Sequence, residues 1–235
     1  RAYFATERGN GDWMESWLEL WDGKPHESAL LPGYGWAFPA GGGISNVGLG
    51  MLSTSPAFAR TNYKDLMLRW LAATPPEWGF TAENMIGDIR SASLPMAFNR
   101  QPAYSRGLVL VGDAGGMVNP FNGEGIDYAL EAAVLAAEAI AEARSRGWGS
   151  ANAEKALHGY VSHLKHDMGG YFRLGTIFAK LIGHPEVMKM CVRYGLPRKQ
   201  LMKIVHKLLA NLTDARDGDA VDRLINTLTK VAPSA

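Results

Sequence analysis

The feature that most constrains this chain is a short apolar run followed directly by a glycine-rich loop and a long alanine-rich stretch. Residues 107–126 read Gly-Leu-Val-Leu-Val-Gly-Asp-Ala-Gly-Gly-Met-Val-Asn-Pro-Phe-Asn-Gly-Glu-Gly-Ile, and the alanine-rich stretch continues to Arg146. Leu108–Val111 is wholly apolar and rich in β-branched residues, which predicts a strand buried on both faces. A helix is expected over 126–146, because Gly147 stands where a helix-ending glycine is favoured.

The loop in this segment carries groups that suit a bound ligand. Gly112 gives the backbone room for a close approach, and Asp113 at the strand end offers a carboxylate to sugar or ribityl hydroxyls. Gly123 and Gly125 leave backbone N–H groups bare at the start of the helix. Bare amides at the positive end of a helix favour an anionic or carbonyl-rich ligand. We therefore predict a ligand site where this helix begins.

The remaining segments predict a β-rich first part and a helical last part. Strands are expected at 1–7, 15–21, 34–39, 45–52 and 85–96. The run Gly41–Gly43 suits a hairpin between the third and fourth of them. Helices are expected at 62–73, 153–168, 171–182, 186–194, 199–211 and 220–231. The sequence thus predicts a mixed α/β fold with an antiparallel sheet.

Composition excludes several classes of protein. The formal net charge of +1 argues against a nucleic-acid binder, because such proteins carry a strong basic excess. The single cysteine, Cys191, cannot form an internal disulfide, and without a Cys/His cluster we predict no metal site. No stretch reaches the roughly 20 apolar residues that cross a bilayer. A reducing, cytoplasmic compartment fits these observations best.

Two motifs resemble one known family. Gly112-Asp113, Pro120 and the Gly-x-Gly pair at the helix start resemble the second FAD motif of glutathione-reductase-type flavoproteins. Within that group, Asn-Pro-Phe-Asn-Gly-Glu-Gly-Ile at 119–126 is similar to the geranylgeranyl reductase pattern. Upstream, residues 31–39 and Asn46-Val47-Gly48 resemble the same family's Tyr-x-Trp-x-Phe-Pro segment. The likeness is strongest to the subgroup that acts on polyprenyl quinones such as menaquinone.

The resemblance implies a cofactor site for FAD. By position, Asp113 contacts the ribityl chain, Gly125 and Ile126 supply backbone groups to the isoalloxazine, and Pro120 lies beside the ring. The full cofactor-binding set is Gly112, Asp113, Pro120, Gly123, Glu124, Gly125 and Ile126. The resemblance also implies an external electron donor and reduction of a C=C bond in an isoprenoid lipid. No catalytic proton donor is identified in this sequence.

The upstream motif implies a substrate wall. In a strand, Tyr34, Trp36 and Phe38 point to one face, and with Pro39 they are the predicted substrate-binding residues. Three rings on one side of a sheet make a flat apolar wall that suits an isoprenoid chain. Alternatively, the rings are ordinary core. The matching flavin motif favours the wall.

The chain departs from the family in one respect. The Gly-x-Gly-x-x-Gly motif that holds the ADP part of FAD is absent. We therefore expect that an N-terminal dinucleotide-binding half is required as a partner and that this chain alone is inactive. The predicted parts are a β-rich substrate domain at 1–105, the C-terminal part of the FAD-binding domain at 106–147, and a helical region at 148–235.

Three alternatives stay open. An FAD-dependent aromatic hydroxylase is the first, although such enzymes usually carry a histidine after Gly-Asp. A fragment that only binds lipid or protein is the second. The third concerns the helix at 199–211, whose basic surroundings and apolar stripe fit either a core-packed helix or a peripheral contact with the inner face of the cell membrane. That stripe comprises Leu201, Ile204, Val205, Leu208 and Leu209.

Overall fold

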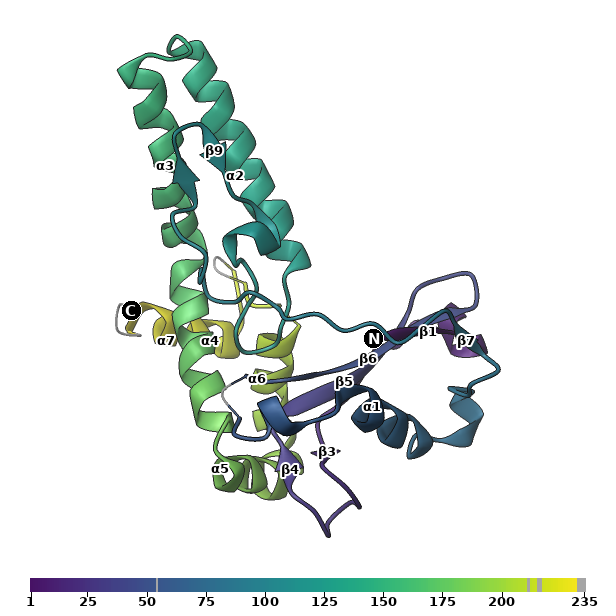
Figure 1. The fold of residues 1–235 in the computed structure, drawn as a ribbon. Helices are drawn as coiled ribbons and strands as arrows, with labels where there is room; N and C mark the ends of the chain where they lie inside the picture. Colours follow the sequence, from purple (N-terminus) through teal and green to yellow (C-terminus); the bar gives the residue numbers. More distant parts are fainter. Residues whose placement is uncertain (54, 211, 215–216, 232–235) are drawn as a thin grey trace. The chain divides into compact units, whose positions relative to one another are not determined.

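A computed structural model describes residues 1–53, 55–210, 212–214 and 217–231 of the chain (Figure 1). The chain divides into two compact units. The first unit comprises residues 1–92 and 180–197, and the second comprises 93–179 and 198–235. The model has an antiparallel sheet together with helices, as the sequence predicts.

The first unit is built on a five-stranded antiparallel sheet with the order β2-β5-β6-β1-β7. Its strands are β1 (Ala2–Ala5), β2 (Glu15–Trp17), β5 (Gly33–Pro39), β6 (Ile44–Met51) and β7 (Met85–Ile86). Two short strands, β3 (Leu20–Trp21) and β4 (Leu30–Leu31), pair separately. The helices are α1 (Tyr63–Ala72) and α5 (Pro185–Met190), and a π-helical turn at Cys191–Gly195 follows α5.

The predicted hairpin at Gly41–Gly43 is confirmed, since β5 and β6 pair along their whole length around it. All three glycines have positive φ angles, a conformation that few other residues adopt without strain. The strand predicted at 85–96 is wrong beyond Ile86. Gly87 has a φ of 70° and turns the chain away, and Pro95 has no N–H for a ladder.

The second unit is mainly helical. A hairpin of β8 (Tyr104–Ser105) and β9 (Leu108–Val109) precedes α2 (Ile126–Ser145), α3 (Ala151–Asp167) and α4 (Gly169–Ile182), whose last residues belong to the first unit. Then come α6 (Lys199–Leu209) and α7 (Ala220–Val231). Buried alanines on α2 pack against α3 in the main core of this unit. Small side chains let the two helices approach closely along their length.

The prediction that Leu108–Val111 is a strand buried on both faces is wrong for this chain. Strand β9 comprises only Leu108 and Val109, and the side chain of Leu108 is 63% exposed. The reason is that the core of the second unit covers one face of the run, where Val109 and Val111 pack against it, while Leu108 on the other face is exposed. The apolar run therefore has a covered side and an uncovered one.

Helix α6 is packed against the core of its unit. The predicted helix at 199–211 is observed over Lys199–Leu209, and Asn211 lies outside the described residues. Leu208 is buried in a cluster with Leu174 and Ile225. This arrangement supports the core-packed interpretation of α6. Every helix in the described part of the chain is too short or too polar to cross a membrane.

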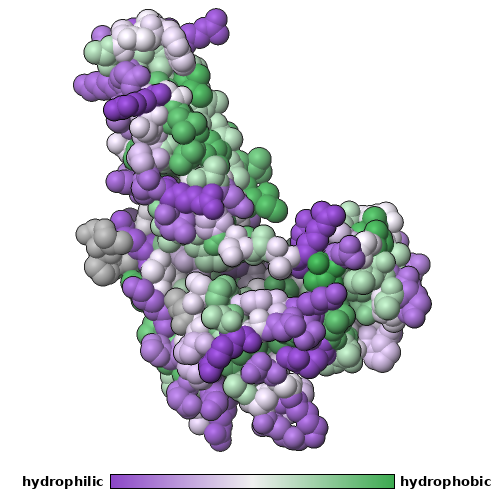
Figure 2. All heavy atoms as spheres, viewed as in Figure 1, coloured by the Kyte–Doolittle hydropathy of each residue, from purple (hydrophilic) through white to green (hydrophobic). Residues whose placement is uncertain are grey.

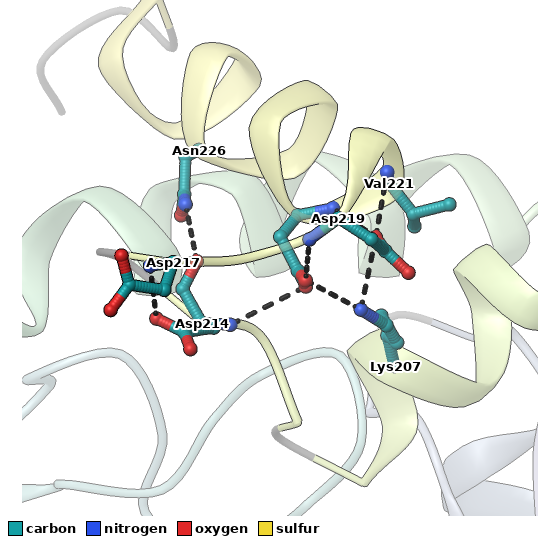
Figure 3. A network of polar contacts seen from close by, with 7 residues as sticks. Lys207, Asp214, Asp217, Asp219, Val221 and Asn226 are labelled. Atoms are coloured by element: carbon teal, nitrogen blue, oxygen red, sulfur yellow. Dashed lines mark hydrogen bonds and ion pairs between the residues drawn. The ribbon is translucent and has the colours of Figure 1, made fainter.

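A buried carboxylate joins α6 to the start of α7 (Figure 3). Asp222 is 2% exposed and accepts hydrogen bonds from Lys207 Nζ at 2.6 Å and from Asp219 N at 2.8 Å. Lys207 Nζ also lies 3.1 Å from Asp219 Oδ1. Two carboxylates around one ammonium thus fix the α6–α7 connection.

Candidate functional site

The loop that precedes α2 begins with a tight turn against that helix. Gly112–Gly115 is a 3-10 turn, and Gly112 has a φ of 60°. A Cβ added at Gly112 would stand 3.1 Å from the Cβ of Ala129. The space that we predicted for a ligand at Gly112 therefore faces α2, and the glycine serves strand-to-helix packing.

Two asparagines that the sequence reasoning missed fix the shape of the loop. Asn119 is fully buried, accepts from Phe121 N at 2.9 Å and donates to the Tyr128 hydroxyl at 3.1 Å. Asn122 accepts from Glu124 N at 2.8 Å and donates to the Leu209 carbonyl at 2.9 Å. The signal for both was their position in Asn-Pro and Asn-Gly turns, where asparagine side chains hold neighbouring backbone groups.

An open hollow lies at the start of α2. It encloses about 450 Å³ and is lined by Leu94, Asp113, Val118, Gly123, Gly125, Ile126, Ala129 and Leu130. A Cβ at Gly125 would stand 3.0 Å from Val118 Cγ2 and 3.7 Å from Asp113 Oδ1. Four predicted cofactor residues are thus brought together here, namely Asp113, Gly123, Gly125 and Ile126. An apolar hollow with one carboxylate at its edge suits a flat ring that carries a polar chain.

The amides at the start of α2 are not bare, which corrects our prediction. The Glu124 carboxylate folds back so that Oε1 accepts from Ile126 N at 2.8 Å and from Asp127 N at 3.3 Å. Its second oxygen, Oε2, is buried and has no hydrogen-bond partner within the described residues. Burial raises the pKa of Glu124. The chain thus supplies its own anion to the helix terminus.

Pro120 does not line the hollow. It is buried, and a Cβ added at Gly175 of α4 would stand 3.2 Å from its Cγ and 2.8 Å from Asn119 Oδ1. The loop therefore packs closely against α4 at a glycine. Pro120 makes this contact and is not among the residues that line the hollow.

The three rings of β5 share one face, as predicted. The ring centroids of Tyr34 and Trp36 are 5.9 Å apart, and those of Trp36 and Phe38 are 6.1 Å apart. All three are partly exposed and lie outside the core of the first unit. The opposite face of β5 packs inward, where a Cβ at Gly35 would stand 2.4 Å from the Trp70 ring. The rings therefore form a surface and not the core.

Glycines on β6 make room for this surface. Tyr34 pairs with Gly50 and Trp36 pairs with Gly48, so the residues of β6 opposite these two rings carry no side chain. A Cβ at Gly48 would stand 2.4 Å from Trp36, whose Nε1 donates to Asn46 Oδ1 at 3.1 Å. The indole of Trp36 is therefore held against β6.

Pro39, which we predicted to bind substrate together with the rings, lies on the opposite face of β5, because successive side chains of a strand alternate between its two faces.

The chain is similar to curated reductases over nearly its whole length, although no family model matches it. It is 33% identical over 227 residues to a menaquinone reductase of Mycolicibacterium smegmatis, covering 97% of this chain and 52% of that protein. A menaquinone reductase of Mycobacterium tuberculosis is 34% identical over 95% of this chain and 51% of its own length. The chain spans about half the length of these curated relatives.

More distant matches concern parts of the chain and the fold. A digeranylgeranylglycerophospholipid reductase of Methanosarcina mazei is 34% identical over 49% of this chain and 27% of that protein. The crystal structure of a geranylgeranyl bacteriochlorophyll reductase-like protein from Thermoplasma acidophilum has a similar fold, with a TM-score of 0.57 and 20% identity over 84% of this chain and 48% of that one. The chain is therefore related to the menaquinone reductases over about half of their length, and its fold is similar to that of a geranylgeranyl reductase-like protein.

Proposed function

We propose that a protein containing this chain is a flavin-dependent reductase that saturates a double bond in the isoprenoid tail of a polyprenyl quinone such as menaquinone. The observation that carries this proposal is the hollow at the start of α2, which gathers Asp113 and Gly125 in a chain related to menaquinone reductases. The relatives support the reaction class, and the hollow supports the place of the cofactor.

The residues around the hollow fit FAD on one condition. Asp113 would accept hydrogen bonds from the ribityl hydroxyls, and the amides of Gly125 and Ile126 would face the carbonyl edge of the ring. The condition is that Glu124 releases the amide of Ile126, which its carboxylate now holds. Bound flavin supplies hydride chemistry that no protein side chain provides. Gly112, Gly123 and Pro120 would act on the site through the shape of the loop.

The aromatic face of β5 is proposed to bind the isoprenoid chain. Tyr34, Trp36 and Phe38 present neighbouring aromatic rings on one face, which would exclude water from an apolar substrate. An isolated double bond is unactivated, so its reduction needs a dry, well-aligned site and a proton. Glu124 Oε2 is a candidate to hold that proton, because it is buried without a partner among the described residues.

We propose a separate role for each of three consecutive segments of the chain. Residues 1–105 bind substrate, 106–147 contact FAD, and 148–235 form a helical region. A dinucleotide-binding half and an external electron donor complete the enzyme. We also retain a cytoplasmic location with peripheral contact at the inner face of the cell membrane, since a polyprenyl quinone resides in the bilayer.

The proposal is tested by joining this chain to the region of the Mycolicibacterium smegmatis relative that lies outside the match. We expect the joined protein to bind flavin, with absorbance at about 450 nm. We also expect the reduced enzyme to reduce a polyprenyl quinone. Asp113→Ala should lose flavin, whereas Asp217→Ala, on an exposed loop, should retain it. Flavin-coupled hydroxylation of a phenol with oxygen consumption would instead support the hydroxylase alternative.

A further inference from the structure

A row of side chains crosses the sheet of the first unit on the face that carries the β5 rings. Phe38 of β5 stands opposite Asn46 of β6, Asn46 stands opposite Tyr3 of β1, and Tyr3 stands opposite Ile86 of β7. Directly opposed residues of antiparallel strands point to the same face. All four side chains are at least partly exposed, and only that of Asn46 carries an amide.

The side-chain amide of Asn46 has a fixed orientation. Trp36 Nε1 donates to Asn46 Oδ1 at 3.1 Å. An indole N–H can only donate, so it must meet the oxygen of the amide and not the nitrogen. Asn46 Nδ2 makes no hydrogen bond within the residues that the structure describes, and it is not buried either. The row therefore presents two free N–H donors among aromatic and apolar side chains.

A lipid that covers the β5 rings would also cover this amide. Asn46 is hydrogen-bonded to Trp36 and stands opposite Phe38, and the rings of Trp36 and Phe38 are stacked with centroids 6.1 Å apart. A hydrocarbon tail offers no acceptor, so it would remove water from Nδ2 and leave its donors unpaired, which is unfavourable. The position next to Asn46 therefore favours a part of the ligand that carries an oxygen.

We propose that Asn46 binds the headgroup of the quinone. Its Nδ2 donates to a carbonyl oxygen of the naphthoquinone, whose flat rings lie against Phe38, and the isoprenoid tail continues along β5 over Trp36 and Tyr34. Flat aromatic rings stack favourably on one another, and the amide supplies the orientation that stacking lacks. This inference rests on the proposed function and assigns the two ends of the substrate to two ends of one sheet face.

The experiment has to separate this role from a merely structural one, because Asn46 also holds the Trp36 indole. Asn46→Asp keeps an oxygen that accepts from Trp36 Nε1 and replaces the Nδ2 donor by a second acceptor. Asn10→Asp is the matched control. Asn10 is exposed and its Oδ1 accepts from Gly43 N at 2.7 Å, so the same change adds the same charge to the same unit and keeps that hydrogen bond.

The test compares two ligands with the same short isoprenoid tail. One is a naphthoquinone, and the other is the corresponding naphthalene, which has the same fused rings without the oxygens. Their dissociation constants for this chain are measured by competition with a fluorescent polyprenyl probe. We expect Asn46→Asp to lower the preference for the quinone over the naphthalene by about tenfold, which corresponds to the loss of one hydrogen bond. Asn10→Asp should leave the preference unchanged.

The original chain provides a second measurement. The NMR signal of the Asn46 side-chain amide, identified by its absence from Asn46→Asp, should shift when the quinone is added and not when the naphthalene is added. Circular dichroism establishes that each variant is folded.

The proposal is overturned if Asn46→Asp keeps the preference for the quinone, or if the quinone leaves the Asn46 signal unchanged. If neither ligand binds, the proposal fails together with the role of the β5 rings. A preference for the quinone that depends on Asn46, without flavin or activity in the joined protein, would leave this inference standing and count against the proposed function alone.

Discussion

Helices α2 and α6 both carry apolar side chains, and the structure treats them differently. The sequence singled out α6 as a helix with one apolar stripe, and that stripe packs on its own unit through Leu208 and Ile204. It identified α2 by its glycine-rich start and its alanine-rich run, without an apolar stripe. Yet α2 exposes an apolar face, the outer stripe, which comprises Ile126, Leu130, Ala133, Val134, Ala137, Ile140 and Ala141. In Figure 2, hydrophobic side chains run along the edge of the second unit where Figure 1 draws α2. Packing within the second unit therefore covers part of the apolar stripe of α6, whereas it leaves one apolar face of α2 exposed.

The largest effect that we expect separates the two helices directly. Leu208→Ala should lower the free energy of unfolding by about 3 kcal/mol, because Leu208 is 6% exposed and truncation leaves a cavity. Leu130→Ala, on the outer stripe, should change it by less than about 0.5 kcal/mol. Urea unfolding of both variants measures the difference. Equal losses would mean that the outer stripe is covered in this chain, and the comparison would fail.

The ion-pair network sharpens the same contrast, since it shows what holds α6 in place. Asp222→Ala removes the buried acceptor of Lys207 and of the Asp219 amide, so we expect a loss of about 2 kcal/mol in urea unfolding. Asp217→Ala, at an exposed position just before α7, should cost less than about 0.5 kcal/mol. A neutral Asp222→Ala would mean that the network does not anchor the helix.

The network also has a pH signature. The hydrogen bond from Lys207 to Asp222 raises the pKa of Lys207 above its ordinary value of 10.5. Because that pKa is raised in the folded state, its stabilising effect is complete below 10.5 and is lost as the pH rises through the raised value. Unfolding followed from pH 9 to 12 should show this decline in the original chain and a weaker one in Asp222→Ala.

Local patterns predicted most of the fold. The helix at 126–146 was predictable because its alanine-rich run is uninterrupted, and the β5–β6 hairpin because Gly41–Gly43 can adopt positive φ angles. The strand at 108–111 was predicted as buried because its run is wholly apolar. That inference presumes a neighbour on each face, and sequence periodicity does not say which layers a given chain contains.

The site was predictable in its residues and less so in its contacts. Asp113 and Gly125 come together as the motif implied. The position of Pro120 could not be foreseen, because it depends on Gly175, which is far along the sequence and lies against it. Glu124 was treated as one of several cofactor residues, although its side chain is long enough to reach back over the helix terminus. Such contacts depend on side-chain conformation, which residue spacing does not fix.

A smaller effect on stability is expected where a small residue lies beneath another side chain, compared with a small residue that has free space around it. Gly48→Ala should displace the Trp36 ring, which lies 2.4 Å from the position of the new Cβ, and cost about 1–2 kcal/mol. Gly50→Ala is the matched control, since its Cβ would stand 3.9 Å from the same ring. Ala137→Leu on the outer stripe should be tolerated, as its surroundings are exposed. Unfolding and the tryptophan emission spectrum report both consequences.

If Gly48→Ala leaves the tryptophan emission of the protein unchanged, the Trp36 indole is not held against β6. The sheet would then not fix the position of the aromatic face of β5. A loss of isoprenoid binding in Gly48→Ala, with binding retained in Gly50→Ala, would further connect the aromatic face to substrate.

The smallest effect concerns the start of α2, where the exposed helix face meets the hollow. Burial raises the pKa of Glu124 above its ordinary value of 4.5, so its contribution to stability is present below 4.5 and is lost as the pH rises through the raised value. Glu124→Gln should abolish this decline between pH 4 and 7, while its amide oxygen still caps Ile126 N. The difference should stay under about 1 kcal/mol, because the carboxyl is partly open to solvent. A pH-independent difference between the two proteins in urea unfolding would show that Glu124 is not strained by burial. In that case flavin would displace the Glu124 carboxylate from the helix amides no more easily than it would displace an ordinary capping side chain.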